Sequence, residues 1–179
     1  MHTPETIYII YGLNKIGAVA NMVYLTLSAN EIIENIKSTD SKAFIYFAMI
    51  QEKGRIIEKE FPDIKTIILD VSDSMPWYLK YPYRLKNKKD ILGKTYRFKN
   101  FLSLGEGVVA KEMLYTKSAP AVIVYTSGTT GVPKGVVLSN DNLNAVAEQY
   151  SYTTFDFRMG DSFMVMLPPF LGFGISIGI

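Results

Sequence analysis

Segments with helical spacing alternate with short apolar runs along the first seventy residues, and this alternation constrains the fold more than any other feature. The apolar runs, such as KAFIYFA, are continuous and have the length of buried strands. Because the connections are short, the strands are expected to form a parallel layer with right-handed crossovers, flanked by helices. The pattern predicts helices over 5–16, 29–37 and 51–60 and strands over 18–25, 41–48 and 65–70.

Turn and cap residues mark where these elements begin and end. Gly17 follows the first predicted helix and stops it, since glycine accepts the left-handed backbone that ends many helices. Ser28 and Glu31 have the spacing of a capping box, in which each side chain binds the backbone N–H of the other residue. Pro62 ends the third helix because the residue before a proline, here Phe61, disfavours helical backbone.

Periodicity is lost between residues 71 and 118, which are predicted to form an irregular basic and aromatic excursion. Residues 80–99 contain eight basic residues and one acidic residue, whereas the whole chain has a net charge of +2. A solvated surface loop is the preferred interpretation, and a membrane surface bound through residues 75–99 is kept as an alternative. Single-stranded nucleic acid would suit the same mixture of rings and cations, but it is not expected as a partner.

Regular structure is expected again after residue 118, with strands over 119–126, 136–139 and 161–167, a loop over 127–135 and a helix over 140–150. Asn140 and Asp141 are expected to cap this helix. Two stretches, 6–27 and 163–179, are apolar enough to suggest membrane spans. Glycines, prolines or polar residues interrupt both, so the first is expected to be a helix and a strand, and the second a core strand and a loop.

The residue types that are missing exclude several kinds of chemistry. The chain has no cysteine, which excludes disulfides, thiolate metal sites and cysteine nucleophiles. Its single histidine is His2, so a serine–histidine–acid triad and a histidine-rich zinc site are excluded as well. No metal-ligating set is predicted. Any reaction must therefore rely on hydroxyls, backbone amides, lysines and carboxylates.

The segment with the clearest chemical content is YTSGTTGVPKG, which runs from Tyr125 to Gly135. Its glycines permit backbone angles that other residues avoid, so successive N–H groups can converge on an anion. Its hydroxyls add hydrogen-bond donors and Lys134 adds a positive charge, a combination that suits a polyphosphate. A Walker A loop is excluded because Lys134 precedes a strand-like run instead of opening a helix. A flexible hairpin without a ligand is the alternative.

Extended to YTSGTTGVPKGVVLSNDNL, this segment resembles the signature of the adenylate-forming (AMP-binding) superfamily, which includes acyl-CoA synthetases and other AMP-dependent ligases. Residues 3–45 are similar to the family's helix, glycine turn, strand and following helix, and LPPFLGFG at 167–174 resembles the segment where its acyl pocket begins. The resemblance implies an α/β fold: part of the N-terminal domain of the adenylate-forming fold. Its mostly parallel sheet would be flanked by helices and would carry a Gly/Ser/Thr-rich phosphate hairpin.

What the resemblance implies about activity is a two-step ligase. A carboxylate attacks the α-phosphate of ATP, which carries Mg, to give an acyl-adenylate, and the thiol of coenzyme A then displaces AMP. Lys134 would be catalytic, because its charge offsets the charge that grows on the leaving pyrophosphate. The acyl pocket would begin at Phe170, Phe173 and Gly174, with Leu171 where the family often has histidine. The ATP phosphates would be bound by Thr126, Ser127, Gly128, Thr129, Thr130, Gly131, Lys134 and Gly135.

The resemblance also implies that the chain is a fragment, since the family's adenine, ribose and C-terminal lysine segments are not found in it. Residues 1–179 are expected to be one incomplete AMP-binding domain, made of an α/β layer (1–70), the excursion (71–118) and the part with the phosphate loop and the start of the acyl pocket (119–179). By itself the chain is expected to be inactive and to self-associate through uncovered apolar strands.

Two other functions stay open from the sequence. One is an adenylation domain that loads an amino or aryl acid onto a carrier protein, and the other is a nucleotide-binding module without catalysis. No secretory signal is expected at the start, because the apolar run has no basic residues before it and no cleavage site. The expected location is the cytoplasm, with attachment at the periphery of a membrane as the alternative.

Overall fold

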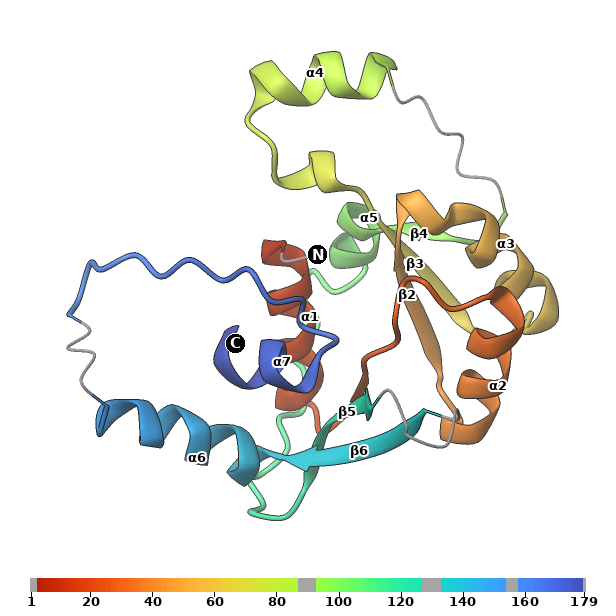
Figure 1. Ribbon diagram of the computed structural model, residues 1–179. Coiled ribbons are helices and arrows are strands. Elements are labelled where there is room, and N and C mark those ends of the chain that lie inside the picture. Colours follow the sequence, from red (N-terminus) through yellow and green to blue (C-terminus); the bar gives the residue numbers. More distant parts are fainter. Residues whose placement is uncertain (1–2, 87–92, 127–132, 154–157, 179) are drawn as a thin grey trace. The chain divides into compact units, whose positions relative to one another are not determined.

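The structure is a computed structural model, and it describes residues 3–86, 93–126, 133–153 and 158–178. The chain forms two compact units. The continuous unit is Leu25–Val109, and the discontinuous unit combines Met1–Tyr24 with Ala110–Ile179. Each unit has its own three-stranded sheet, and Figure 1 shows the helices around each one.

The sheet of the continuous unit is parallel and has the order β2 (Ala43–Phe47), β3 (Lys65–Leu69), β4 (Tyr96–Arg97). β2 and β3 pair along their whole length, with each residue of β2 opposite one of β3. β4 adds only two residues, Tyr96 and Arg97, opposite the middle of β3. The two longer strands and their parallel pairing confirm the predictions made from the apolar runs.

Two helices cover the core of this unit. α2 (Ala29–Thr39) and α3 (Gln51–Glu60) contact each other, and α3 also contacts β2 and β3. A short 3₁₀ turn, η1 (Ala48–Ile50), leads into α3. The helices and β3 bury branched side chains against one another, as the helical spacing of the sequence predicts. The buried isoleucines are Ile32, Ile36, Ile57, Ile67 and Ile68.

The predicted capping box at the start of α2 is confirmed. The Glu31 carboxylate accepts hydrogen bonds from the Ser28 backbone N–H and from the Ser28 hydroxyl, both at 2.7 Å. The Ser28 hydroxyl in turn accepts from the Glu31 backbone N–H at 3.3 Å. Because these bonds favour the ionised carboxylate, the Ser28 side chain and backbone lower the pKa of Glu31.

The stretch from residue 71 to residue 118 contains more regular structure than the sequence predicts. A 3₁₀ turn, η2 (Val71–Ser74), is followed by α4 (Trp77–Lys86), β4 and α5 (Phe98–Ser103). Pro82 lies inside α4 and lacks the N–H that would bind the preceding turn, which is why the sequence argues against a helix here. Residues 104–118 form turns and extended backbone, as expected.

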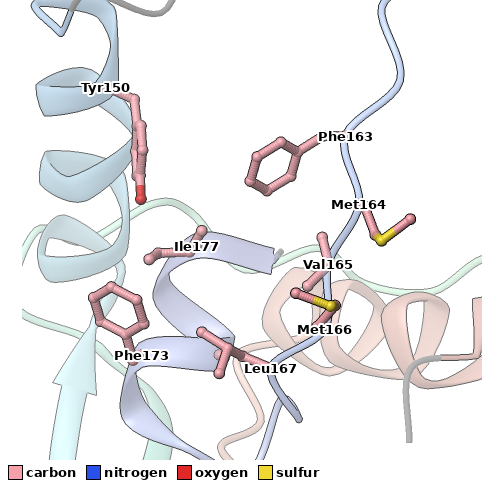
Figure 2. Close-up of a pocket in the computed structure, with 9 residues that line it drawn as sticks. Tyr150, Phe163, Met164, Val165, Met166, Leu167, Phe173 and Ile177 are labelled. Atoms are coloured by element: carbon pink, nitrogen blue, oxygen red, sulfur yellow. The ribbon is translucent and has the colours of Figure 1, made fainter.

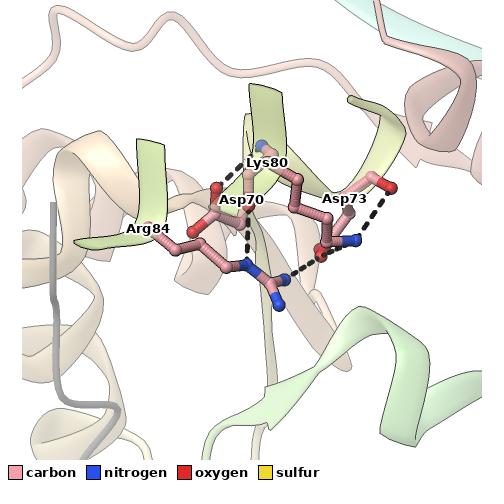
Figure 3. A network of polar contacts seen from close by, with 5 residues as sticks. Asp70, Asp73, Lys80 and Arg84 are labelled. Atoms are coloured by element: carbon pink, nitrogen blue, oxygen red, sulfur yellow. Dashed lines mark hydrogen bonds and ion pairs between the residues drawn. The ribbon is translucent and has the colours of Figure 1, made fainter. Parts of the chain in front are cut away.

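Polar contacts join α4 to η2. Figure 3 shows Lys80 and Arg84, one turn apart on α4, directed at Asp73. The Arg84 guanidinium lies 2.8 Å from the Asp73 carboxylate and also donates to the Ser72 hydroxyl at 3.0 Å. Asp70 accepts a hydrogen bond from the Ser72 backbone N–H and thereby caps η2. These interactions join residues at most 12 positions apart in the sequence. They depend on side-chain geometry, which the spacing of apolar residues does not indicate, so the sequence did not predict them.

The sheet of the discontinuous unit has the order β1 (Ala20–Asn21), β5 (Pro120–Thr126), β6 (Lys134–Ser139). β1 is parallel to β5, and β5 is antiparallel to β6. Strand 18–25 was expected to join the same sheet as strands 41–48 and 65–70, and this expectation is wrong. Only two residues of it pair, and they pair with a strand a hundred positions away. Periodicity shows that a segment is extended but does not specify its partner.

α1 (Pro4–Lys15) completes the core of this unit and ends where predicted. Gly17 follows with a positive φ of 73°, the left-handed conformation that was predicted to end the helix at this glycine. Segment 110–118 is attached to α1 by a hydrogen bond from the Met113 N–H to the Lys15 carbonyl, at 3.0 Å. An ion pair joins Lys15 and Glu112 at 2.7 Å. The buried core consists of Ile10, Ala20, Ala121, Val122, Val124 and Ile175.

α6 (Asn140–Ser151) confirms the helix predicted over 140–150, although its cap is one residue earlier than expected. Ser139 is the N-cap, and its side chain accepts from the Asn142 N–H at 3.3 Å. Asp141 lies in the first turn and accepts a hydrogen bond from the Tyr115 hydroxyl, which raises the pKa of Tyr115.

The last segment differs most from the prediction. Residues 161–167 are extended but pair with no strand among the described residues, so the predicted strand is absent. α7 (Gly172–Gly178) forms where a loop was expected. Pro168 and Pro169 precede this helix, so they do not interrupt it, and the Leu171 N–H binds the Pro168 carbonyl at 3.0 Å. No helix in the described part of the chain is long and apolar enough to cross a membrane.

Candidate functional site

The two strands that flank the predicted phosphate loop form an antiparallel stem. Thr126 at the end of β5 lies opposite Lys134 at the start of β6, and Tyr125 lies opposite Gly135. The stem therefore brings a threonine and the proposed catalytic lysine to the same end of the sheet. The remaining predicted phosphate ligands lie outside the described residues: Ser127, Gly128, Thr129, Thr130 and Gly131.

The stem combines a buried strand with an exposed one. Ala121, Val122 and Val124 of β5 are almost completely buried, whereas most of β6 is exposed. Lys134 and Thr126 are both exposed, so their polar groups are accessible to a ligand in solvent. Both groups lie at the end of a sheet whose middle strand, β5, is anchored in the core.

Two tyrosines attach the end of β5 to the chain around β1. The Tyr24 hydroxyl donates a hydrogen bond of 2.6 Å to the Tyr125 carbonyl. The Tyr125 hydroxyl donates a 3.0 Å hydrogen bond to the side-chain carbonyl of Asn21. Sequence analysis did not identify Tyr24 or Asn21 as site residues, because nothing in their local pattern indicates that they contact a strand a hundred residues later.

Gly135 has a packing reason to be glycine in addition to its predicted role. A Cβ atom at this position would lie 3.3 Å from Ile123 and 3.3 Å from the Tyr125 ring. Both distances are tighter than ordinary van der Waals contact, so a side chain here would push the ring or the strand. The glycine therefore lets β6 approach Tyr125 closely at the base of the loop.

The predicted acyl-pocket residues separate into two places. Phe173 and Gly174 line an apolar cavity of about 290 Å³ between α6, α7 and the extended segment before α7. Figure 2 shows Phe173 and Ile177 on α7, with Tyr150 on α6 and the chain from Phe163 to Leu167 around them. Phe170 is not part of this lining. Its ring packs edge-on against Tyr24, with centroids 5.3 Å apart and planes at 76°.

Six of the nine residues that line the cavity were not singled out from the sequence as pocket residues, because they come from an extended segment and from one face of two helices. They are Tyr150, Phe163, Met164, Val165, Met166 and Ile177. The predicted segment 167–174 also contributes Leu167. The apolar run from Phe163 to Leu167 was the available signal, but it was assigned to a core strand. Four of these five residues are exposed, and the run borders an open cavity instead.

Gly174 is required for the shape of this cavity. A Cβ atom here would lie 2.0 Å from the Pro168 carbonyl oxygen and 3.0 Å from that of Leu167. Because backbone atoms cannot move aside as a flexible side chain can, only glycine lets α7 pass this close to the preceding segment. Within the described residues, no group of three or more acidic or histidine side chains is placed to hold a metal ion.

Comparison with known proteins identifies the protein family of this chain. The model of the family described as AMP-binding enzyme matches residues 1–179. The chain belongs to this family.

Two curated relatives are long-chain-fatty-acid–CoA ligases. The chain is 31% identical to ACSBG2 of Homo sapiens over 140 residues, which is 74% of this chain and 20% of that protein. It is 25% identical to the ligase of Bacillus subtilis over 174 residues, 93% of this chain and 31% of the relative. The chain therefore spans about a fifth to a third of the length of these relatives.

A solved structure shows the same fold. The inhibitor-bound N-terminal domain of FACL13 from Mycobacterium tuberculosis superimposes with a TM-score of 0.67 at 24% sequence identity. The match covers 98% of this chain and 38% of that one. The α/β fold class, expected as part of an N-terminal adenylate-forming domain, is thus confirmed. Residues 127–132 of the predicted phosphate hairpin lie outside the described residues.

Proposed function

We propose that this chain supplies the phosphate loop and part of the acyl pocket of an AMP-forming carboxylate–CoA ligase. The observation that carries the proposal is the stem that brings Thr126 and Lys134 together at one end of β5 and β6, in a chain of the AMP-binding enzyme family. The substrates are ATP with its Mg ion, a carboxylate and coenzyme A. The reaction forms an acyl-adenylate and pyrophosphate, and the thiol of coenzyme A then displaces AMP.

Lys134 acts on the leaving group in this proposal. As the bond between the α- and β-phosphates breaks, negative charge accumulates on pyrophosphate, and an ammonium group nearby lowers the energy of that state. The Thr126 hydroxyl and the backbone amides of the loop donate hydrogen bonds to the same oxygens. Because the charge grows during the reaction, Lys134 contributes more to the rate than to the binding of the carboxylate.

The apolar cavity supports an alkyl carboxylate over an amino acid. None of the nine residues described in its lining is charged, and a carboxylate would be needed to pair with the amine of an amino acid. Two of the relatives are ligases of long-chain fatty acids. A fatty acid with its chain in the cavity, and coenzyme A in place of a carrier protein, is therefore the proposed substrate pair.

The test is ATP–pyrophosphate exchange by the full-length protein with a fatty acid. Lys134→Ala is expected to lower kcat by about a hundredfold, the effect of removing one group that stabilises developing charge, with the KM for the carboxylate little changed. Lys117→Ala, which removes another exposed lysine of the same unit, is the matched control. Exchange at the wild-type rate in Lys134→Ala would contradict the assigned role.

A second role is favoured by one observation, the exposed rings of α4. Trp77 is 82% exposed and Tyr81 is 73% exposed, and they lie one turn apart. We infer that this helix binds the surface of an anionic membrane, with the protein in the cytoplasm and Lys86 beside the lipid headgroups. Lys80 and Arg84 contact Asp73 and so keep α4 in place.

Self-association of the chain is the third proposal. Met164 and Met166 are each 80% exposed in the lining of the apolar cavity, and Phe173 is 66% exposed. Contiguous apolar surface of this kind is costly in water, and a second copy of the chain can cover it.

A further inference from the structure

Tyr24 contacts two segments of the proposed site with one side chain. Its hydroxyl binds the carbonyl of Tyr125, the residue before Thr126, where the described part of the phosphate loop ends. Its ring packs edge-on against Phe170, which lies in the chain between Leu167 of the cavity lining and α7 but does not line the cavity itself. All three residues belong to the discontinuous unit, and Tyr24 is half-buried among them.

The place of the Tyr24 hydroxyl beside the sheet explains why it can hold the end of β5. β1 and β5 pair in parallel, and the last backbone bond between them runs from the Met22 N–H to the Ile123 carbonyl, at 2.9 Å. In a parallel pair of strands, the next backbone hydrogen bond from this strand to β5 would be donated by the Tyr24 N–H to the Tyr125 carbonyl. There the Tyr24 hydroxyl donates to that carbonyl instead, over 2.6 Å. The Tyr24 side chain thus adds one more hydrogen bond between the two segments, at the end of β5.

A second bond reinforces the same junction. The Tyr125 hydroxyl donates to the Asn21 side chain at 3.0 Å, so the ends of β1 and β5 are joined by two side-chain hydrogen bonds as well as by the ladder. On the other side of β5, Gly135 lets β6 approach the Tyr125 ring closely. The residue that precedes the loop is therefore held from both sides.

We propose that Tyr24 is a positioning residue that holds Thr126 and its partner Lys134, at the end of β5 and the start of β6, in register with the segment that carries Phe170. This inference rests on the proposed function. Adenylation requires the carboxylate oxygen to approach the α-phosphate in line, so a small change in the distance between the two binding segments lowers the rate strongly. Tyr24 fixes that relation by binding Tyr125 through its hydroxyl and Phe170 through its ring.

Two substitutions separate the contacts, and both are measured in the full-length protein by ATP–pyrophosphate exchange and by amide hydrogen exchange. Tyr24→Phe removes the hydroxyl and keeps the ring. It is expected to lower kcat about two- to tenfold, the usual effect of one lost hydrogen bond, with the KM for ATP little changed and faster hydrogen exchange in residues 124–126 and 134–136, where β5 ends and β6 begins. Tyr24→Leu removes both contacts and is expected to lower kcat further. Tyr8→Phe, at a tyrosine of α1 that is 66% exposed, is the matched control.

The outcomes distinguish this inference from the proposed function. Wild-type kcat and unchanged hydrogen exchange of residues 124–126 and 134–136 in Tyr24→Phe would overturn the positioning role, and so would a general loss of thermal stability without a local change in these residues. Equal rates in Tyr24→Leu and Tyr24→Phe would remove the connection to Phe170. If the wild-type protein performs no ATP–pyrophosphate exchange, the proposed function fails. The hydrogen exchange of residues 124–126 and 134–136 then still decides whether Tyr24 positions this end of the sheet, since faster exchange in Tyr24→Phe supports that role and equal exchange refutes it.

Discussion

Gly174 illustrates how a single residue shapes the candidate site. Helix α7 passes so close to the preceding segment that a Cβ atom at Gly174 would lie 2.0 Å from the Pro168 carbonyl oxygen. Ile175, the next residue, is 1% exposed and belongs to the core with Val122 and Val124 of β5. One missing methyl group thus allows α7 to bury Ile175 while Phe173 stays at the cavity.

Gly174→Ala is expected to lower the free energy of unfolding by about 1–3 kcal/mol, the usual cost of forcing an extra methyl into a packed site. Gly172→Ala is the matched control, because its Cβ atom would lie 3.6 Å from Val124, an ordinary contact. Urea denaturation of the two variants measures the difference. Equal midpoints for Gly174→Ala and Gly172→Ala would show that α7 does not pack against the Pro168 backbone in solution.

Glu31 makes a pH-dependent contribution at the start of α2. Its pKa is lowered from the ordinary value of 4.5 by the hydrogen bonds from Ser28, so the folded state favours the ionised form. The stabilisation is therefore present above the unfolded pKa and is lost as pH falls through the lower, folded pKa. Glu31→Gln should be less stable than wild type at neutral pH, and the difference should vanish in acid.

Thermal melting as a function of pH checks this expectation. Glu106→Gln, which removes an exposed carboxylate of the same unit, should leave the melting temperature unchanged across the whole range. A difference between wild type and Glu31→Gln that persists at low pH would mean that the capping box stabilises the helix without its charge.

At the scale of elements, α4 has one face of cations that contact η2 and another of exposed aromatic and apolar side chains. Lys80 and Arg84 bind Asp73 in η2, whereas Trp77, Tyr81 and Leu85, at intervals of four residues, are all more than half exposed. Two cations are therefore used to attach the helix, and the rings are left on the accessible side. Aromatic rings with nearby lysines are typical of helices that lie at a membrane interface.

Trp77→Ser is expected to reduce sedimentation of the protein with anionic liposomes, and added salt should reduce the sedimentation of wild type, because screening weakens the attraction of the lysines to lipid headgroups. Tyr152→Ser is the control, since Tyr152 is an equally exposed ring, at 81%, in the other unit. Recovery of wild type in the supernatant with and without liposomes would refute membrane binding by α4.

At the scale of the whole molecule, the discontinuous unit exposes apolar side chains, and we expect this surface to govern its behaviour in solution. The segment before α7 presents methionines to solvent, and Phe173 is exposed beside them. In the same unit β6 is largely exposed, with Val137 at 55%. A chain with this surface lowers its free energy by covering it.

Light scattering with size-exclusion chromatography across a dilution series is expected to show that the apparent mass of the 179-residue chain rises with concentration. The double variant Met164→Ser/Met166→Ser should shift the chain toward the monomer, because both side chains line the exposed cavity. Met159→Ser is the control, since Met159 is fully exposed but lies outside that lining. A monomer at every concentration would refute self-association.

Much of the continuous unit follows from the sequence, because its elements are determined by neighbouring residues. α3 begins and ends where the helical spacing and Pro62 predict, and the Ser28–Glu31 box forms as its spacing requires. β2 and β3 are adjacent in the sequence and pair along their length, as a strand–helix–strand unit does. α4 is the exception, since it forms with Pro82 inside it, and its contacts with Asp73 in η2 are not part of any helical spacing.

The sequence by itself determined the family, the α/β class, most helices and the segment that carries the phosphate chemistry, because each rests on a local pattern or a contiguous motif. Only the tertiary structure decided that β1 pairs with β5 and that Tyr24 holds Tyr125 and Phe170. It also decided that residues 163–167 border a cavity that α7, a helix not predicted from the sequence, lines as well. Such contacts join residues up to 146 positions apart, and their energy comes from packing and hydrogen bonds that no local spacing encodes.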